Sequence, residues 1–385
     1  MTCTKKEILL QPWKSYNCYN AAVGTVLTAA GYPFVALALN SSWDFYLDRL
    51  NPGDISMAGV FNATEHPAVG INLARIYDLE LKEYACPDWG SWLALLSDKL
   101  KKGGLPMVRL KNRFCEYIPK VERTGVLDHY LIATSLDEDR LCFFDSFLNH
   151  YGQFPLSRLK EIQESAMEPG EGRYFKTWIL TGLTGEDYRY VGGGGAGCDA
   201  GPVGRWAMSD AASGAVVDSG SGGIRRMVND VFFSSLPEGA FGERNERRIS
   251  RNEEAIKELG DLLAGALPGG FGESALQCLS ESLRYVQYQR KYFISSLEEI
   301  GSYFPGCRDE AAAISGRVNA ISDDWFRLRL TILYNLRKGI TDRGGALVKE
   351  LADGLYAISG KERAIRSGIG LFKERFMNAS VSAML

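Results

Sequence analysis

The feature that most constrains the fold of this 385-residue chain is a sustained helical periodicity in its last third. Large apolar residues recur there at spacings of three, four or seven, which places them on one face of each helix. They form three stripes, which run from Leu276 to Ile300, from Ile314 to Leu336 and from Leu347 to Phe376. Pro305-Gly306 and Gly344-Gly345 separate the stripes. Three amphipathic helices with short connections bury a common face by packing antiparallel, so the sequence predicts a C-terminal helical bundle.

A glycine-rich segment separates this bundle from the rest of the chain. Residues 192–223 hold eleven glycines among serines and alanines, with too few large apolar residues to form a core. This composition is typical of a linker or loop. Because a chain of this length exceeds the usual size of one core, we expect a first domain over 1–190, a linker or loop over 191–240 and a helical domain over 241–385.

The first domain alternates helical and strand patterns. Helices are expected over 18–30 and 90–102, and strands over 105–110, 129–134, 140–144 and 174–180. The two middle strands flank the polar turn Asp137-Glu138-Asp139, which predicts a β-hairpin. The mixture predicts an α+β domain.

Composition excludes several classes of partner. The net charge of −3 gives no overall basic field that would attract nucleic acid or an anionic membrane surface. No apolar run approaches the ~20 residues that span a bilayer. The N-terminus lacks the charged-then-apolar layout of a signal peptide. We therefore expect a cytoplasmic protein that binds neither nucleic acid nor membrane.

The sequence predicts no metal site and no intrinsic cofactor. The eight cysteines are scattered without a Cys-x-x-Cys pair, which argues against structural zinc and against a dense disulfide framework. His66 and His150 lie in turn-like segments without clustered ligands. The formal dinucleotide fingerprint over 192–197 lacks the strand and helix that it needs, so we attribute it to glycine content.

Cys18 stands immediately before small and apolar residues that are typical of a helix start. The first turn of a helix has unpaired backbone N–H groups and a positive dipole end, which favour a thiolate and can hold a developing oxyanion. Cys18 is therefore a candidate nucleophile. The alternative is a buried cysteine that acts as a small hydrophobic side chain.

A histidine and an aspartate on the predicted hairpin can complete such a site. His129 opens the first strand and Asp145 follows the second, so pairing of the strands can bring both to one end of the sheet. An imidazole that acts as a general base needs a partner that fixes its tautomer and stabilises its charged form. The order Cys18, His129, Asp145 is that of a papain-like triad. Singly, the two could be a half-buried strand histidine and a turn aspartate.

Two stretches resemble a known family. WLALLSDKLKKGGLPMVRLK, residues 92–111, is followed by HYLIATSLDEDRLCFFD, residues 129–145. Together they resemble the helix, Gly-x-Pro strand and His-hairpin-Asp layout of papain-like cysteine peptidases of the bacteriocin-leader type. They are more similar still to the N-terminal domain of the butirosin biosynthesis protein H family, over about residues 10–185. The resemblance implies a papain-like cysteine-peptidase fold that carries out acyl transfer in specialised metabolism.

The resemblance also implies roles for individual residues. Cys18 would be the nucleophile, His129 the base and later the acid, and Asp145 the orienting group. The acyl donor would be the phosphopantetheine thioester of a carrier protein, and the acceptor a small-molecule amine or water. The chain departs from the family pattern at Asn17, where a histidine is common, and at Gln11, which lies seven residues before the cysteine instead of six. Both side chains are therefore candidate oxyanion donors.

Further residues have two possible roles. Tyr19, Trp43 and Trp89 are candidates for a substrate groove near the thiol, with core packing as the alternative. Cationic residues on the C-terminal helices, such as Arg327 and Arg337, could dock an acidic carrier protein or form ordinary exposed helix faces. The helical domain could also mediate homo-oligomerisation.

The candidate triad is compatible with three functions. An acyltransferase or thioesterase that acts on carrier-bound thioesters is the function that the resemblance implies. A cysteine peptidase or amidase of the same fold would use the same three groups. A papain-like module retained for binding would use none of them.

Overall fold

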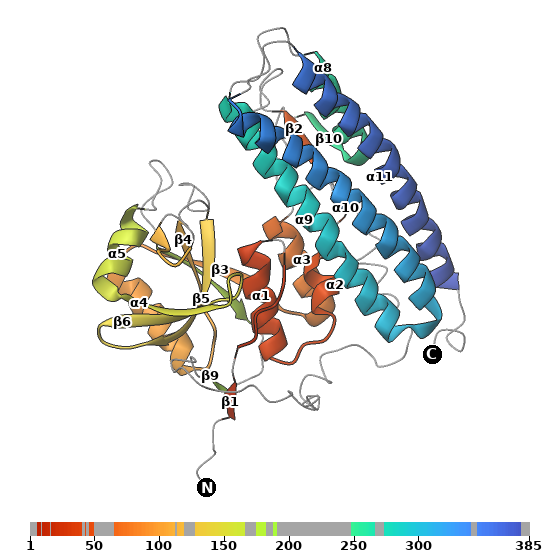
Figure 1. The fold of residues 1–385 in the computed structure, drawn as a ribbon. Helices are drawn as coiled ribbons and strands as arrows, with labels where there is room; N and C mark the ends of the chain where they lie inside the picture. The colour runs from red at the N-terminus through yellow and green to blue at the C-terminus, as the bar shows by residue number, and fades with distance from the viewer. Residues whose placement is uncertain are drawn as a thin grey trace, which may run out of the picture. The chain divides into compact units, whose positions relative to one another are not determined.

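The computed structural model describes residues 6–8, 10–15, 17–40, 43, 46–49, 65–111, 114–118, 128–165, 175–181, 188–190, 248–265, 273–339 and 345–378. The chain divides into two compact units (Figure 1). The first, here called the sheet unit, comprises Met1–Val35 and Leu73–Val217, and the second, the helical unit, comprises Ala36–Asn72 and Asp218–Leu385. The units are interleaved, unlike the consecutive domains expected from the sequence. The predicted linker over 191–240 lies outside the described residues.

The sheet unit is built on an antiparallel sheet of six strands in the order β3-β8-β4-β5-β6-β7. The strands are β3 (Glu80–Cys86), β4 (Met107–Lys111), β5 (Asp128–Leu136), β6 (Arg140–Asp145), β7 (His150–Pro155) and β8 (Phe175–Thr181). The α+β class and the hairpin β5–β6 are confirmed. We did not predict β3 and β7, the two edge strands. Edge strands have charged and exposed residues, and β7 also contains Gly152 and ends in a proline.

Helices cover both faces of this sheet (Figure 1). The helices α4 (Trp89–Lys101) and α5 (Leu156–Ser165) pack on one face, where Trp92, Leu159 and Leu131 share a buried core. The helix α1 (Cys18–Ala29) packs against β5 from the other face, where Tyr19 meets Tyr130 with their ring centroids 5.0 Å apart. Because neighbouring residues of a strand point to opposite faces, Tyr130 faces α1 while Leu131 faces α4.

The helical unit contains the predicted C-terminal helices, which run side by side (Figure 1). They are α9 (Glu273–Tyr303), α10 (Arg308–Arg337) and α11 (Ala346–Asn378), and a further helix that the three stripes did not predict, α8 (Asn252–Ala264), precedes them. The break predicted at Pro305-Gly306 is a 3-10 turn, η3 (Pro305–Cys307), and Gly345 has a φ of +77° just before α11. None of the helices described for this chain combines the length and the apolar composition that crossing a bilayer requires.

An N-terminal segment belongs to the helical unit because it bonds to α9. In α2 (Val35–Asn40), the Leu37 N–H donates to Glu299 Oε2 at 2.8 Å and Asn40 Nδ2 donates to Ser295 Oγ at 3.1 Å. In addition, β2 (Tyr46–Arg49) pairs with β10 (Arg248–Arg251) in this unit. The helix α3 (Glu65–Tyr77) crosses the boundary between the units, and β1 (Lys6–Ile8) pairs with β9 (Tyr188–Tyr190) in the sheet unit.

A buried ion pair connects the long helices. Arg290 of α9 donates from Nε to Glu362 Oε1 of α11 at 2.9 Å, and both side chains are almost fully buried. Trp325 of α10 donates its indole N–H to the same oxygen at 2.9 Å. The guanidinium also lies 4.1 Å from the ring centroid of Trp43. These directional contacts set the register of three helices against one another.

Candidate active site

The hairpin β5–β6 brings His129 and Asp145 together. Its register pairs Ile132 with Phe144. His129 and Asp145 are each an odd number of residues from this pair, so both project from the same face of the sheet, the one opposite to Ile132 and Phe144. Nε2 of His129 lies 2.6 Å from Oδ2 of Asp145, a short charge-assisted hydrogen bond between buried side chains. The structure therefore joins these two candidate residues at the end of the sheet where the sequence placed them.

Asp145 is held rigidly by donors on both carboxylate oxygens. Its Oδ1 accepts from the backbone N–H groups of Phe147 and Leu148 at 3.0 and 3.1 Å, in the turn that follows β6. Its Oδ2 accepts from the Tyr117 hydroxyl at 2.9 Å as well as from His129. The side chain has an exposed fraction of 0%. A buried carboxylate with this many donors has one orientation, and so has the imidazole bonded to it.

Cys18 is the first residue of α1, as the sequence predicted. Asn17 is the N-cap, and its Oδ1 accepts from the Asn20 N–H at 2.6 Å. The first turn contains no acidic residue. Cys18 is partly exposed, and it lies at the positive end of the helix dipole.

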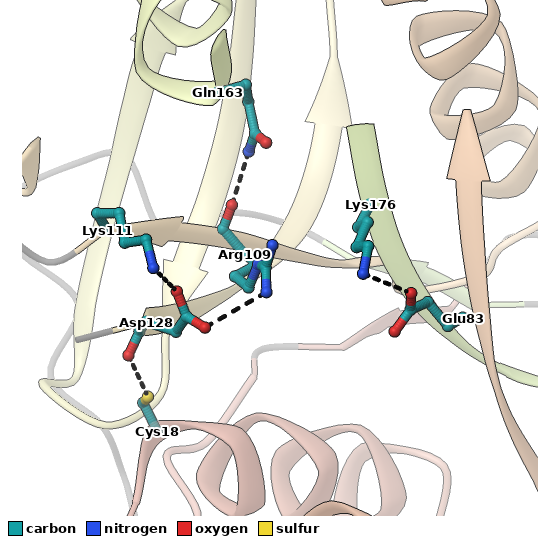
Figure 2. Close-up of polar contacts among 7 residues, drawn as sticks. All are labelled: Cys18, Glu83, Arg109, Lys111, Asp128, Gln163 and Lys176. Atoms are coloured by element: carbon teal, nitrogen blue, oxygen red, sulfur yellow. Dashed lines mark hydrogen bonds and ion pairs between the residues drawn. The ribbon is translucent and has the colours of Figure 1, made fainter. Parts of the chain in front are cut away.

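A hydrogen bond connects α1 to the start of β5. The Cys18 thiol donates to the carbonyl oxygen of Asp128, with Sγ and O 3.7 Å apart (Figure 2). The Asp128 carboxylate is in turn held by Lys111 Nζ at 2.9 Å and by Arg109 at 3.4 Å, both on β4. These contacts position the next residue of β5, His129, next to the N-terminus of α1.

The electrostatics couple His129 to Cys18. Burial lowers the pKa of the His129 imidazole, but a negative charge on Cys18 and hydrogen bonds to Asp145 and Cys18 raise it by more. The net pKa lies well above the usual 6.5, which stabilises an imidazolium beside the sulfur. Because Nε2 is bonded to Asp145, Nδ1 is the ring nitrogen that can exchange a proton with Cys18.

The two candidate oxyanion donors differ in their surroundings. Asn17 is buried next to the nucleophile, and its Nδ2 has no hydrogen-bond partner among the described residues. The Gln11 side chain is exposed. The N–H groups of the first helical turn, Cys18 among them, lack an intrahelical acceptor. Asn17 Nδ2 and the Cys18 N–H therefore form the better pair of candidate donors.

The three aromatic candidates for a substrate groove lie in packed surroundings. Tyr19 is buried against Tyr130. Trp89 packs on Trp92 and Phe175 in the core beneath α4, with ring centroids 5.1 and 5.5 Å away. Trp43 belongs to the helical unit, where it packs against Phe293 at 4.9 Å and against Arg290. The contacts of all three are those of the core-packing alternative.

Sequence reasoning missed Tyr117. Besides donating to Asp145, its ring stacks on His150 with centroids 4.2 Å apart. Burial and the charge of Asp145 raise the pKa of the phenol, which keeps its hydroxyl protonated as a donor. The pairing of β6 with β7 places Asp145 next to His150, so Tyr117 can contact both side chains. No sequence pattern connects residue 117 to Asp145 or to His150.

The remaining histidines differ from expectation. The prediction that His66 and His150 lie in turns is wrong, because residue 66 lies in α3 and His150 opens β7. Neither segment has the apolar periodicity that identifies a helix or a strand in a sequence. Cys115, close to the site, is fully buried, and burial raises the pKa of its thiol, so it is no competing nucleophile.

Within the described ranges, no three His, Cys, Asp or Glu side chains are grouped so that they could hold a metal ion. No family model and no curated protein sequence matches the chain. The function is therefore inferred from the chemistry of Cys18, His129 and Asp145.

Proposed function

We propose that this chain is a cysteine-nucleophile acyltransferase with a papain-like sheet unit, which takes an acyl group from a carrier-protein thioester and passes it to an amine. The observation that carries the proposal is the buried His129–Asp145 pair, 2.6 Å apart, with its imidazole electrostatically coupled to a thiol at a helix N-terminus. A histidine held this way has the charge and the tautomer that activation of a thiol needs.

The first half-reaction would transfer the acyl group to the enzyme. His129 Nδ1 takes the Cys18 proton, and the thiolate attacks the thioester carbonyl carbon to form a new C–S bond. The tetrahedral intermediate collapses, the bond to the pantetheine sulfur breaks, and His129 returns its proton to that leaving sulfur. One thioester replaces another, so this step has little thermodynamic cost.

The second half-reaction would release the acyl group. An amine attacks the carbonyl carbon of S-acyl-Cys18, the new C–N bond forms and the C–S bond to Cys18 breaks. His129 takes the proton that the amine loses and returns it to the Cys18 sulfur. Water in place of the amine would give hydrolysis by the same steps.

The surrounding residues would stabilise the two charges that form in these steps, the oxyanion and the His129 imidazolium. The Cys18 N–H and Asn17 Nδ2 would donate to the oxyanion, and loss of one such donor typically lowers the rate about 10²–10³-fold. Asp145 stabilises the imidazolium, and Tyr117 positions Asp145. Asp145 and Tyr117 act through hydrogen bonds and take no part in bond making.

Intact-mass spectrometry tests the proposal. The full chain is incubated with an acyl-carrier protein thioester and no acceptor. We expect the mass to increase by one acyl group, and we expect no increase for Cys18→Ala. Cys86→Ala is the matched control, because Cys86 is also a partly buried free cysteine and lies on the edge strand β3. It should acylate like the unmodified chain.

The alternatives give different results. An adduct from peptide amides and none from thioesters would identify a peptidase or amidase and contradict the carrier-bound donor. No adduct from either donor, together with iodoacetamide labelling of Cys18 as slow as that of the other cysteines, would leave the binding module as the function.

A further inference from the structure

The helix α10 has a second apolar face that its own bundle does not use. Four large apolar residues of its C-terminal half have exposed fractions between 36% and 58%, namely Phe326, Leu330, Leu333 and Tyr334. Their spacings of four, seven and eight residues place them on one face. The other face of α10 is buried in the bundle, for example through Trp325 and Ile332. Exposed helix faces are ordinarily polar, so a contiguous apolar stripe indicates a contact surface.

The exposed apolar residues are confined to one half of the helix. In the N-terminal half of α10 the exposed positions are small or polar, as at Ala312, Gly316, Arg317 and Ala320. The apolar stripe therefore has a defined centre, and that centre is Leu330.

The charges at the two ends of the stripe are opposite and equidistant from its centre. Asp323 lies seven residues before Leu330 and Arg337 seven residues after it. Seven residues are about two helical turns, so both charges share the face of the stripe. Asp324 is already paired with Arg327 and Lys361, whereas Asp323 and Arg337 form no ion pair with another described residue.

We propose that α10 pairs antiparallel with α10 of a second copy of the chain, about a two-fold axis at Leu330. A two-fold axis at Leu330 brings a residue that lies a given number of positions before Leu330 next to the residue that lies the same number of positions after Leu330 in the other copy. Leu330 then meets Leu330 of the second copy, and Phe326 meets Tyr334. Asp323 of each copy meets Arg337 of the other, which gives two ion pairs at the ends of an apolar seam.

The charge arrangement favours a second copy over an acidic partner. A partner helix with acidic edges would be attracted by Arg337 but repelled by Asp323, whereas an antiparallel copy satisfies both ends. One helix pair buries an area at the low end of stable interfaces, about 1,200 Å² or less, so the dimer should form reversibly as concentration rises. This inference is independent of the proposed function.

Sedimentation velocity on the full chain tests this pairing. The molecular mass of the sedimenting species should rise from that of one chain to that of two chains as the protein concentration increases. Leu330→Glu places two like charges at the axis and should weaken association at least about tenfold. The matched control is Leu371→Glu, because Leu371 is an even more exposed leucine, at 56%, on α11. This variant should associate like the unmodified chain.

Charge reversal tests the direction of the pairing. Asp323→Arg and Arg337→Asp should each weaken the dimer, and the double variant should recover it. Circular dichroism checks that each variant is folded. A chain that stays monomeric at all concentrations, or a dimer that Leu330→Glu leaves intact, overturns the proposal. A dimer that both charge reversals weaken but their combination does not restore overturns the antiparallel arrangement.

Discussion

Both units of this molecule bury a carboxylate inside a hydrogen-bond network, and the two networks differ in one chemical respect. In the sheet unit, Asp145 accepts from His129, and in the helical unit, Glu362 accepts from Arg290. A guanidinium stays charged at all pH values at which proteins function, so it neither takes up nor releases a proton during a reaction. The imidazole titrates, and it is electrostatically coupled to the Cys18 thiol.

The comparison shows that burial and charge do not by themselves identify a site. Both carboxylates lie in low-dielectric surroundings and each accepts at least two hydrogen bonds. Only the network around Asp145 combines a titratable base with a nucleophile. Chemical function is therefore expected from one network and structural specificity from the other.

The largest expected effect is on the reactive network. His129→Ala removes the base and should slow acyl transfer about 10⁴-fold or more, because the thiol is no longer activated. Iodoacetamide alkylation of Cys18 should slow as well. Single-turnover acylation measures the first and peptide mass mapping the second. If this variant were acylated as fast as the unmodified chain, the network around Asp145 would not be reactive, and it would not differ in function from the network around Glu362.

The structural network should respond in stability and not in chemistry. Glu362→Leu leaves Arg290 buried without its carboxylate and should lower the free energy of unfolding by about 3–5 kcal/mol. The double variant Arg290→Met/Glu362→Leu should recover most of this loss. Urea denaturation measures both, and acylation per folded molecule should be unchanged. A double variant as unstable as the single one would contradict this account.

A third acid, the partly buried Glu299, sharpens the comparison because no cation of the described residues compensates its burial in the way that Arg290 compensates Glu362. Burial raises the pKa of Glu299 from its ordinary 4.5 to about 7, although N–H groups of Leu37 and Ala36 counteract the shift. Between these pH values the folded protein holds a proton that the unfolded chain has released, so stability falls as pH rises. The loss across this window should be roughly 3 kcal/mol.

Denaturation midpoints from pH 4.5 to pH 7 test this dependence. Glu299→Gln keeps an oxygen that can accept from the Leu37 N–H, and it should lose the part of the pH dependence that Glu299 contributes, while the contribution of His129 near pH 7 stays. The exposed neighbour Glu298 supplies the control, since Glu298→Gln should retain the whole pH dependence. Equal pH profiles for the unmodified chain and Glu299→Gln would refute the assignment.

The smallest expected effect concerns Tyr117. Tyr117→Phe removes a donor from Asp145 and should slow acyl transfer about tenfold. The carboxylate that loses a donor holds the imidazolium more strongly, so the alkaline limb of the pH–rate profile should move to higher pH. Tyr151→Phe is the control, because its hydroxyl donates to the Leu10 carbonyl and not to Asp145. A change in stability without a change in the pH profile would limit Tyr117 to a packing role.

Much of the local structure was predictable from residue patterns. The helix that begins at Cys18, the hairpin that carries His129 and Asp145, and the long C-terminal helices all follow from periodicity within a short window. The edge strands β3 and β7 were not predictable in this way, because exposed strands lack the apolar alternation of buried ones.

Residue patterns along the chain were sufficient to predict the helix that begins at Cys18 and the hairpin that carries His129 and Asp145, because both elements depend on near neighbours. The hydrogen bond from Tyr117 to Asp145, the bonds from Leu37 and Asn40 to α9, and the opposite surroundings of Asn17 and Gln11 were decided by folding. Such contacts join segments that are distant along the chain, and the packing of the whole core determines which of them meet.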